Sequence, residues 1–195
     1  MRLFVAVNLP DAERHALAEA LSGLSRGTLP VRWTARDGLH ITMKFLGEVD
    51  DALAAPLGDA LAPALVDVRP FDLSLGGGVG AFPSLEQPQV LWVGVERHPA
   101  LELLANDVER ALAGFGFAPE LRPFQPHITV GRVKKGARAA ALKPLARQVA
   151  GFAYEGTMVV EGVDLMRSTP GASGSRYDVV RSAPLGGGSK TRAPR

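Results

Sequence analysis

Two kinds of hydrophobic pattern alternate along this chain. Alternating or short apolar runs predict strands near residues 2–8, 39–46, 70–75, 89–96, 126–133, 152–160, 162–168 and 176–182. Apolar residues three or four positions apart predict helices over about 12–24, 51–66 and 99–113, and a short helix within 138–149. The mixture of strands and helices predicts an α+β fold.

Two of the predicted strands carry the same four-residue pattern. The strings His40-Ile41-Thr42-Met43 and His127-Ile128-Thr129-Val130 both read His, Ile, Thr, apolar. Successive side chains of a strand point to opposite faces, so each string places its His and Thr on one face and its two apolar residues on the other. Each strand therefore has an apolar face for the core and presents an imidazole beside a hydroxyl.

The spacing of these strings indicates an internal duplication. The two histidines are 87 residues apart, and each motif strand has a predicted helix before it and after it. We therefore expect two similar α+β lobes with a cleft between them, lined by both motifs.

Two imidazoles and two hydroxyls suit acid–base chemistry at phosphorus. At neutral pH one histidine can accept a proton from a nucleophile while the other donates one to the leaving oxygen. The threonine hydroxyls can donate to oxygens that gain charge. Serine or cysteine nucleophile chemistry is disfavoured, because the chain has no cysteine and no Gly-x-Ser-x-Gly string.

Composition and charge set the remaining boundaries. A hydrophobic fraction of 46% fits a globular core, which we expect to span residues 1–182 as a single bilobal domain. Residues 183–195 hold three basic residues and no acid, and we expect a basic, Gly-rich flexible tail there. The net charge is +2, so the body is at −1, and any attraction for phosphate must be local. The absence of cysteine and of long apolar runs is compatible with a cytoplasmic protein that does not enter a membrane.

Other conspicuous residues receive plainer interpretations. His15, in a predicted helix, and His98, before Pro99, are expected to be solvated. The glycine-rich stretch 76–80 lacks the P-loop and dinucleotide-binding spacings, and we interpret it as a flexible connection that borders the cleft or acts as a hinge. Residues 171–174 predict a hairpin loop.

The motif strings and several flanking stretches resemble one known family. The chain is similar to the RNA 2′,3′-cyclic phosphodiesterases, also called 2′-5′ RNA ligases, of the two-histidine phosphoesterase superfamily. The resemblance covers about residues 1–182, with Met43 in place of a more usual Leu and Gln89 where Arg is common. It rests on residues 2–7, 32–33, 39–47, 80–83, 90–94 and 126–133, which include both motifs.

This resemblance implies a fold, a reaction and roles. The fold would have two similar lobes of antiparallel sheet flanked by helices, with the active site in the cleft between them. Water would open a 2′,3′-cyclic phosphate at an RNA 3′ end, with His40 as proton donor and His127 as proton acceptor, to leave a 2′-phosphate. Thr42 and Thr129 would hold the non-bridging oxygens. The reverse step would be ligation without ATP through a 2′-5′ linkage.

Three residues close to the motifs have two interpretations each. Arg132 lies five residues after His127, so strict alternation points it away from the site, and a bulge or bend at Gly131 would return it toward the phosphate. Phe45 has the equivalent offset after His40 and either stacks on a base or packs in the core. Lys44 shares the parity of His40 and is either at the site or merely solvated.

Two other classes of function remain open. A metal site would need more ligands than these strings offer, since neither contains HxH or HExxH, and we expect no metal and no other cofactor. A non-catalytic RNA-binding module would bind RNA without needing the histidines. We rank the hydrolase first, acting as a monomer on RNA 3′ ends that bear a 2′,3′-cyclic phosphate.

Overall fold

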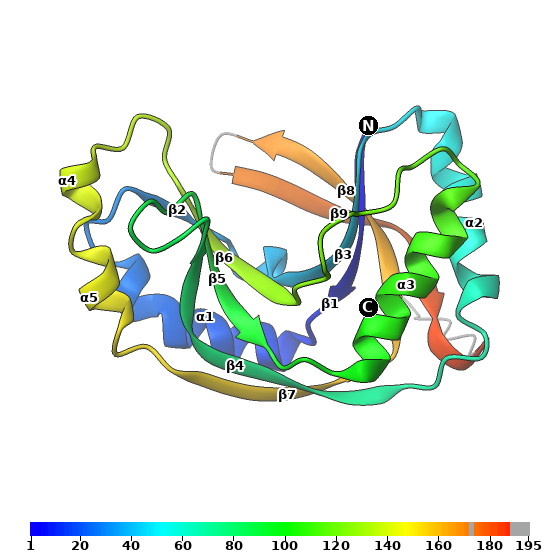
Figure 1. Ribbon diagram of the computed structural model, residues 1–195, viewed down its shortest axis with the longest axis horizontal. Coiled ribbons are helices and arrows are strands. Elements are labelled where there is room, and N and C mark those ends of the chain that lie inside the picture. Colours follow the sequence, from blue (N-terminus) through cyan, green and yellow to red (C-terminus); the bar gives the residue numbers. More distant parts are fainter. Residues whose placement is uncertain (172–173, 188–195) are drawn as a thin grey trace.

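The computed structural model describes residues 1–171 and 174–187 and contains one strongly curled antiparallel sheet with helices packed on its core face (Figure 1). Its strands are β1 (Arg2–Asn8), β2 (Val31–Trp33), β3 (His40–Glu48), β4 (Phe71–Phe82), β5 (Val90–Val95), β6 (His127–Val133), β7 (Tyr154–Val160), β8 (Gly162–Gly171) and β9 (Gly174–Pro184). The helices are α1 (Asp11–Ser25), α2 (Ala54–Ala64), α3 (Pro99–Ala113), α4 (Ala139–Leu142) and α5 (Leu145–Val149). Short 3-10 turns are η1 (Arg36–Gly38), η2 (Asp51–Leu53) and η3 (Leu185–Gly187).

The order of the strands makes the two motif strands central. The sheet runs β7-β4-β5-β6-β3-β1-β8-β9, and β2 pairs with β6 beside β3. Outward from the middle, β6 is followed by three strands on one side and β3 by three on the other. The two halves meet at one recorded residue pair, Ile41 opposite Ile128. The two expected lobes are therefore two halves of a single continuous sheet.

Helix α3 shows how the sequence produces these elements. The ring Nδ1 of His98 accepts the backbone N–H of Ala100 at 3.2 Å, and Pro99 occupies the first turn, where its missing N–H costs nothing. His98 is thus the cap of this helix and stacks on Phe71, rather than being solvated as expected. The apolar stripe of α3 is buried: Leu101, Leu104, Ala105, Val108 and Leu112.

The larger of two hydrophobic clusters connects both halves of the sheet, and a separate small cluster contains Phe4, Ala6 and Met166. The buried residues of the larger cluster come from both halves of the sheet and from the helices, and include Ile41 and Ile128, each fully buried. Helix α1 packs against β7, whereas α2 packs against β9 and α3, and α3 also contacts β3. The helices therefore occupy the core side, and the opposite face of β3 and β6 is left to the polar motif residues.

Several predicted boundaries differ from the structure. The stretch 76–80 lies inside β4, where Gly76 and Gly77 pair with β7, so it is not a connection between lobes. The helix predicted within 138–149 is two short helices. Strand β9 continues to Pro184, and Ala183 and Leu185 are buried in the core. The fold thus extends past residue 182, while residues 188–195 of the expected tail lie outside the described residues.

Residues 171 and 174 pair at the end of the β8–β9 hairpin, as the predicted hairpin loop requires.

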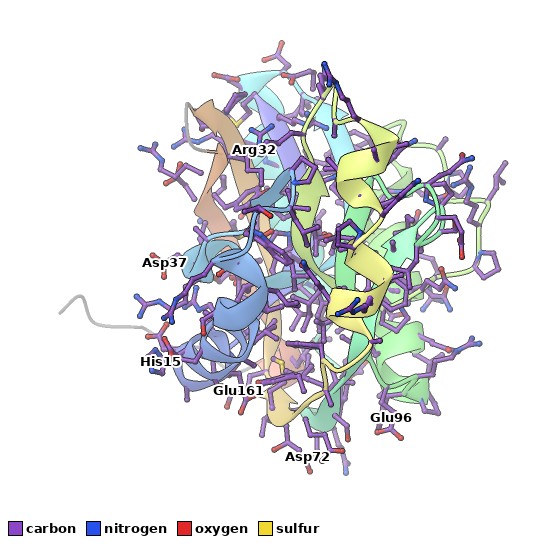
Figure 2. The ribbon with its side chains drawn as sticks, turned by 90° about the vertical axis from the view of Figure 1, so that its left-hand side faces the viewer. His15, Arg32, Asp37, Asp72, Glu96 and Glu161 are labelled. Atoms are coloured by element: carbon purple, nitrogen blue, oxygen red, sulfur yellow. The ribbon has the colours of Figure 1, made fainter. Side chains whose placement is uncertain are left out.

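His15 is exposed on the outer surface of α1, as expected from the sequence (Figure 2). No helix within the described ranges is long and apolar enough to span a membrane.

Candidate active site

The two motifs have the same pattern of burial in the structure. Over the first six residues of β3 and of β6, the first and third residues are partly buried, the second, fourth and fifth are buried, and the sixth is exposed. His40 and Thr42 therefore share one face with each other, as do His127 and Thr129, while Ile41 and Ile128 are on the core side. This arrangement is the one that the alternation of the motifs predicts.

The pairing of the strands brings the four motif residues together. Ile41 is opposite Ile128, so continuing this antiparallel register by one residue places His40 opposite Thr129 and Thr42 opposite His127. His127 and Arg132 both lie close enough to His40 to disfavour a positive charge on its ring. The four residues thus form one group at the centre of the sheet.

The imidazoles are held in a defined orientation by backbone carbonyls. Nδ1 of His127 lies 2.7 Å from the carbonyl oxygen of Gln125, two residues earlier. A carbonyl only accepts, so Nδ1 carries the proton and Nε2 of the neutral ring is left free for chemistry. The ring of His40 makes the matching hydrogen bond with the backbone of Gly38, again two residues earlier.

Two aromatic rings pack against each histidine. The His40 ring lies 4.9 Å from that of Phe4 and 5.1 Å from that of Tyr177, between ring centres. The His127 ring lies 5.0 Å from that of Phe82 and 6.3 Å from that of Trp92. These four aromatic residues were not predicted as part of the site. The alternation in β5 predicts which face of the strand carries Trp92. That this face lies beside His127 became clear only from the pairing of β5 with β6.

Burial by these rings changes the acidity of both histidines. The pKa of His40 is lowered to about 4: desolvation is the largest cause, and the charges of Arg132 and His127 add to it, against the opposing hydrogen bond with the backbone of Gly38. Desolvation likewise lowers the pKa of His127, with Arg132 adding to the effect. Both imidazoles are therefore neutral at pH 7 in the free protein.

A bulge after each threonine changes which later side chains face the site. In β6, Thr129 pairs with Trp92 but Gly131 pairs with the adjacent Leu91, so one residue is extra, and Arg132 becomes exposed on the histidine face. This is the bulge that the sequence required if Arg132 was to face the site.

The corresponding bulge in β3 places Phe45 on the histidine face. Thr42 pairs with Ala6 but Lys44 pairs with the adjacent Val5, so one residue of β3 is extra. The Phe45 side chain is 64% exposed, which excludes the core-packing interpretation. Its ring centre is 6.2 Å from that of Phe4.

Lys44 is not at the site, and the expectation that it shares the face of His40 is wrong. The bulge turns it to the core side, where its side chain is 5% exposed. Its Nζ donates to Glu109 Oε2 at 2.5 Å and to the Ala118 carbonyl at 3.0 Å. Lys44 is thus a buried structural cation that joins β3 to α3 and to the chain beyond it.

The threonine hydroxyls are available to a ligand. Within the described residues, neither Thr42 nor Thr129 uses its side-chain hydroxyl in a hydrogen bond to the protein. Free hydroxyls beside two imidazoles and the Arg132 guanidinium form a site for a compact anion with several oxygens.

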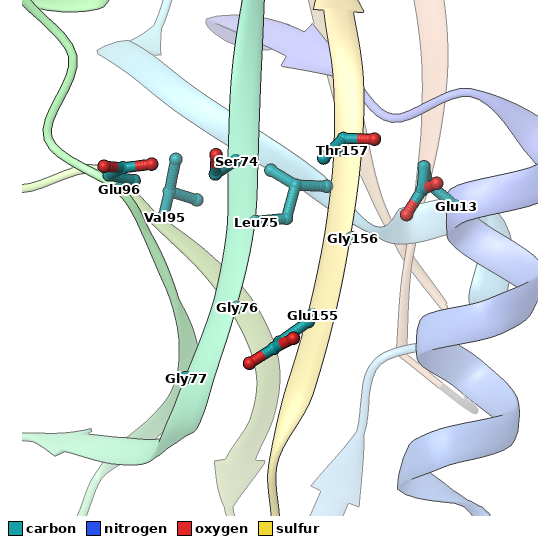
Figure 3. A pocket seen from close by; sticks show the side chains of 10 residues that line it. All are labelled: Glu13, Ser74, Leu75, Gly76, Gly77, Val95, Glu96, Glu155, Gly156 and Thr157. Atoms are coloured by element: carbon teal, nitrogen blue, oxygen red, sulfur yellow. The ribbon is translucent and has the colours of Figure 1, made fainter.

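A cavity of about 640 Å³ lies elsewhere, against β4, β7 and α1 (Figure 3). Glu13, Glu96 and Glu155 line it together with Gly76 and Gly77, and none of the predicted site residues does. Three carboxylates would repel a phosphate. In the part of the chain that the structure describes, no three His, Asp or Glu side chains are grouped to hold a metal ion.

Comparisons with known proteins indicate one family for this chain. Residues 10–172 match the 2′-5′ RNA ligase superfamily. An RNA 2′,3′-cyclic phosphodiesterase of Aeropyrum pernix is 33% identical over 84% of this chain and 92% of its own length. One from Geobacillus stearothermophilus is 38% identical over 68% of this chain, which spans 42% of that protein.

A crystal structure of a protein from Thermus thermophilus has a similar fold. That protein is 30% identical, with a TM-score of 0.78 over 95% of this chain and 98% of the other. Sequence and fold thus agree over most of the chain, which belongs to the 2′-5′ RNA ligase superfamily.

Proposed function

We propose that this protein hydrolyses RNA 2′,3′-cyclic phosphate ends to 2′-phosphates by acid–base catalysis with His40 and His127. The observation that carries the proposal is the group of two imidazoles and two free hydroxyls on one face of β3 and β6. The activity of the relatives that bear this name supports the same reaction.

In the reaction, one P–O bond forms as another breaks. Water attacks phosphorus in line with O3′, His127 takes the proton from that water at Nε2, and the new P–O bond forms as the P–O3′ bond breaks. His40 gives its proton to O3′. The hydroxyls of Thr42 and Thr129 and the guanidinium of Arg132 donate to the non-bridging oxygens, on which charge increases.

The acid role of His40 requires the substrate. With a pKa of about 4, this imidazole is neutral in the free protein at pH 7. A phosphate anion beside it favours the imidazolium and so raises the pKa. We therefore infer that substrate binding raises the pKa of His40, so that the ring takes up from solvent the proton that the leaving oxygen receives.

Ligation is the same displacement in the same direction, with a 5′-hydroxyl in the place of water: the new P–O5′ bond forms as the P–O3′ bond breaks. The site and the order of proton transfers are unchanged, and no ATP takes part. Phe45, exposed at the edge of the site, is positioned to stack on the terminal base. We propose the site to be a cleft between the two halves of the sheet, and the protein to act as a monomer in the cytoplasm.

The decisive experiment measures the hydrolysis of a 2′,3′-cyclic mononucleotide and of a cyclic-ended oligonucleotide. His40→Ala and His127→Ala are each expected to lower kcat/KM by at least about 10²-fold, with His15→Gln on α1 as the matched control. Phosphorus NMR is expected to show the 2′-phosphate alone. A histidine variant with full activity would remove this mechanism, and a mixture of isomers would refute the assigned polarity.

The metal-dependent alternative is tested with the same assay. Side chains of the protein carry out every proton transfer in the proposed reaction, so activity is expected to persist after exhaustive chelation. Loss of activity with rescue by one divalent ion would favour the metal site instead. The binding-module alternative predicts tight RNA binding that survives the loss of both histidines.

A further inference from the structure

Two arginines lie directly opposite each other beside the active site. In the short β2–β6 pairing, Arg32 is the partner of Arg132. Opposed residues of an antiparallel pair point to the same side of the sheet, with Cα atoms about 4.5–5.5 Å apart. Their neighbours Val31 and Gly131 are buried on the core side, so both guanidinium groups are on the histidine face.

This pairing is unfavourable for the fold alone, because like charges directly opposite each other repel. Neither guanidinium group has an ion pair or hydrogen bond to residues 1–171 or 174–187. In contrast, Arg167 and Arg176 nearby in the hairpin both bind Asp178. Two unpaired cations held together on one surface form a site for anions.

Arg32 extends the positively charged part of the site from Arg132 toward the β8–β9 hairpin. Arg132 lowers the pKa of both histidines, so its charge acts at the position proposed for the cyclic phosphate. Arg32 lies beyond it, next to the β8–β9 hairpin, where a Cβ added to Gly174 would be 3.7 Å from Arg32 Cδ (Figure 2). Tyr177 of this hairpin packs against His40. The hairpin thus borders a path from the histidines to Arg32.

We propose that Arg32 binds the phosphodiester on the 5′ side of the terminal nucleotide. The inference rests on the proposed function and specifies its substrate: an RNA chain is bound through two successive phosphates, one at Arg132 and the next at Arg32. A mononucleotide has only the first of these phosphates. The enzyme therefore prefers a cyclic-ended oligonucleotide to a cyclic mononucleotide.

The test compares Arg32→Gln with the wild-type protein on two substrates, a 2′,3′-cyclic mononucleotide and a cyclic-ended dinucleotide. The ratio of kcat/KM for dinucleotide over mononucleotide is expected to fall about tenfold, the loss typical of a charge-assisted hydrogen bond at a solvated site. The dependence of log(kcat/KM) for the dinucleotide on log[salt] is expected to become shallower by about 0.7. Arg26→Gln, at the end of α1, removes the same charge elsewhere and is expected to leave the ratio unchanged.

A binding measurement separates this inference from the proposed function. Titration calorimetry with a 2′-phosphorylated mononucleotide and with a 2′-phosphorylated dinucleotide needs no catalysis. Arg32→Gln is expected to reduce the dinucleotide's advantage in affinity by a similar factor. If the wild type hydrolysed neither substrate, the proposed function would fail and this titration would still decide the role of Arg32. An equal loss for both ligands, or no loss for the dinucleotide, would overturn the inference.

Discussion

At the scale of single residues, burial of the two histidines gives the site its chemistry. Two aromatic rings pack against each imidazole and remove water from it, and desolvation favours the neutral form. The carbonyl of Gln125 fixes the tautomer of His127 and the backbone of Gly38 holds His40. The sequence identified these histidines by their strings, but their depressed pKa values depend on Phe4, Tyr177, Phe82 and Trp92, which come from other strands.

Binding of an anion is expected to protonate the site. The histidine pair is neutral at pH 7, and a sulfate ion bound between the imidazoles and Arg132 would raise the histidine pKa values. Sulfate does not titrate near pH 6.5, so any protons taken up on its binding belong to the protein. We expect uptake of up to about one proton per sulfate, measured by calorimetry in buffers of different ionisation enthalpy. Uptake that persisted unchanged in a His40→Gln/His127→Gln variant would contradict this assignment.

The same burial makes stability depend on pH. The pKa of His40 is lowered from 6.5 in the unfolded chain to about 4, so the unfolded state binds the proton more readily. The stabilisation is therefore complete above pH 6.5 and is lost as the pH falls from 6.5 to 4, by about 3 kcal/mol in all. Urea unfolding of His40→Gln across this range is expected to lack that part of the pH dependence, whereas His15→Gln retains it. An unchanged slope in His40→Gln would refute the burial argument.

At the scale of elements, alternation predicted the motif strands well but failed where a strand has an extra residue. His40, Thr42, His127 and Thr129 lie on the face that a period of two requires. After the threonines, bulges reverse that assignment and exchange the places of Lys44 and Phe45 relative to strict alternation. A bulge is defined by the pairing with a partner strand, so it cannot be predicted from the alternation of residues within one strand.

Other elements were missed for a similar reason. The three-residue strand β2 carries no period of its own, and its existence follows from pairing with β6. The glycines of β4 have few side-chain signals for a strand, but Gly76 is required there: a Cβ would lie 2.0 Å from the carbonyl oxygen of Tyr154 on β7. Close approach of two backbones therefore explains a stretch that composition alone interprets as a hinge.

The bulge in β3 predicts that two substitutions at adjacent positions destabilise the protein to very different extents. Lys44→Met leaves the partly buried Glu109 carboxylate without its cation, and we expect a loss of about 2–4 kcal/mol in the free energy of unfolding. Adding Glu109→Leu is expected to recover part of it. Phe45→Ala removes an exposed ring and is expected to cost less than about 0.5 kcal/mol. Urea unfolding at pH 7 measures all three variants, and similar losses for Lys44→Met and Phe45→Ala would contradict the assigned faces.

At the scale of the whole molecule, two similar halves share one sheet and one core. The 87-residue separation of the histidines predicted the similarity of the halves, and the strand order is consistent with it. The sequence did not indicate whether the halves have separate cores, because the Ile41–Ile128 contact joins residues far apart in the chain. Ile41 and Ile128 each follow a motif histidine in the chain, so the joint between the halves also positions the two imidazoles that we propose as acid and base.

A continuous core predicts that a destabilising substitution at one end of the molecule also lowers the stability of the other end. Leu185 is 3% exposed and lies near the end of the described chain, where its N–H donates to the Glu161 carbonyl at 2.8 Å. Leu185→Ala is expected to cost about 2–5 kcal/mol. Both tryptophans report on the half of the sheet that contains β6, away from Leu185. Trp33 lies on β2 and Trp92 on β5, and both strands pair with β6. If the molecule unfolds as one cooperative unit, Leu185→Ala lowers the free energy of unfolding by the same amount whether urea unfolding is followed by tryptophan fluorescence or by far-ultraviolet circular dichroism. Two separate transitions, or a fluorescence midpoint that the substitution leaves unchanged, would mean that the halves fold independently despite their common sheet.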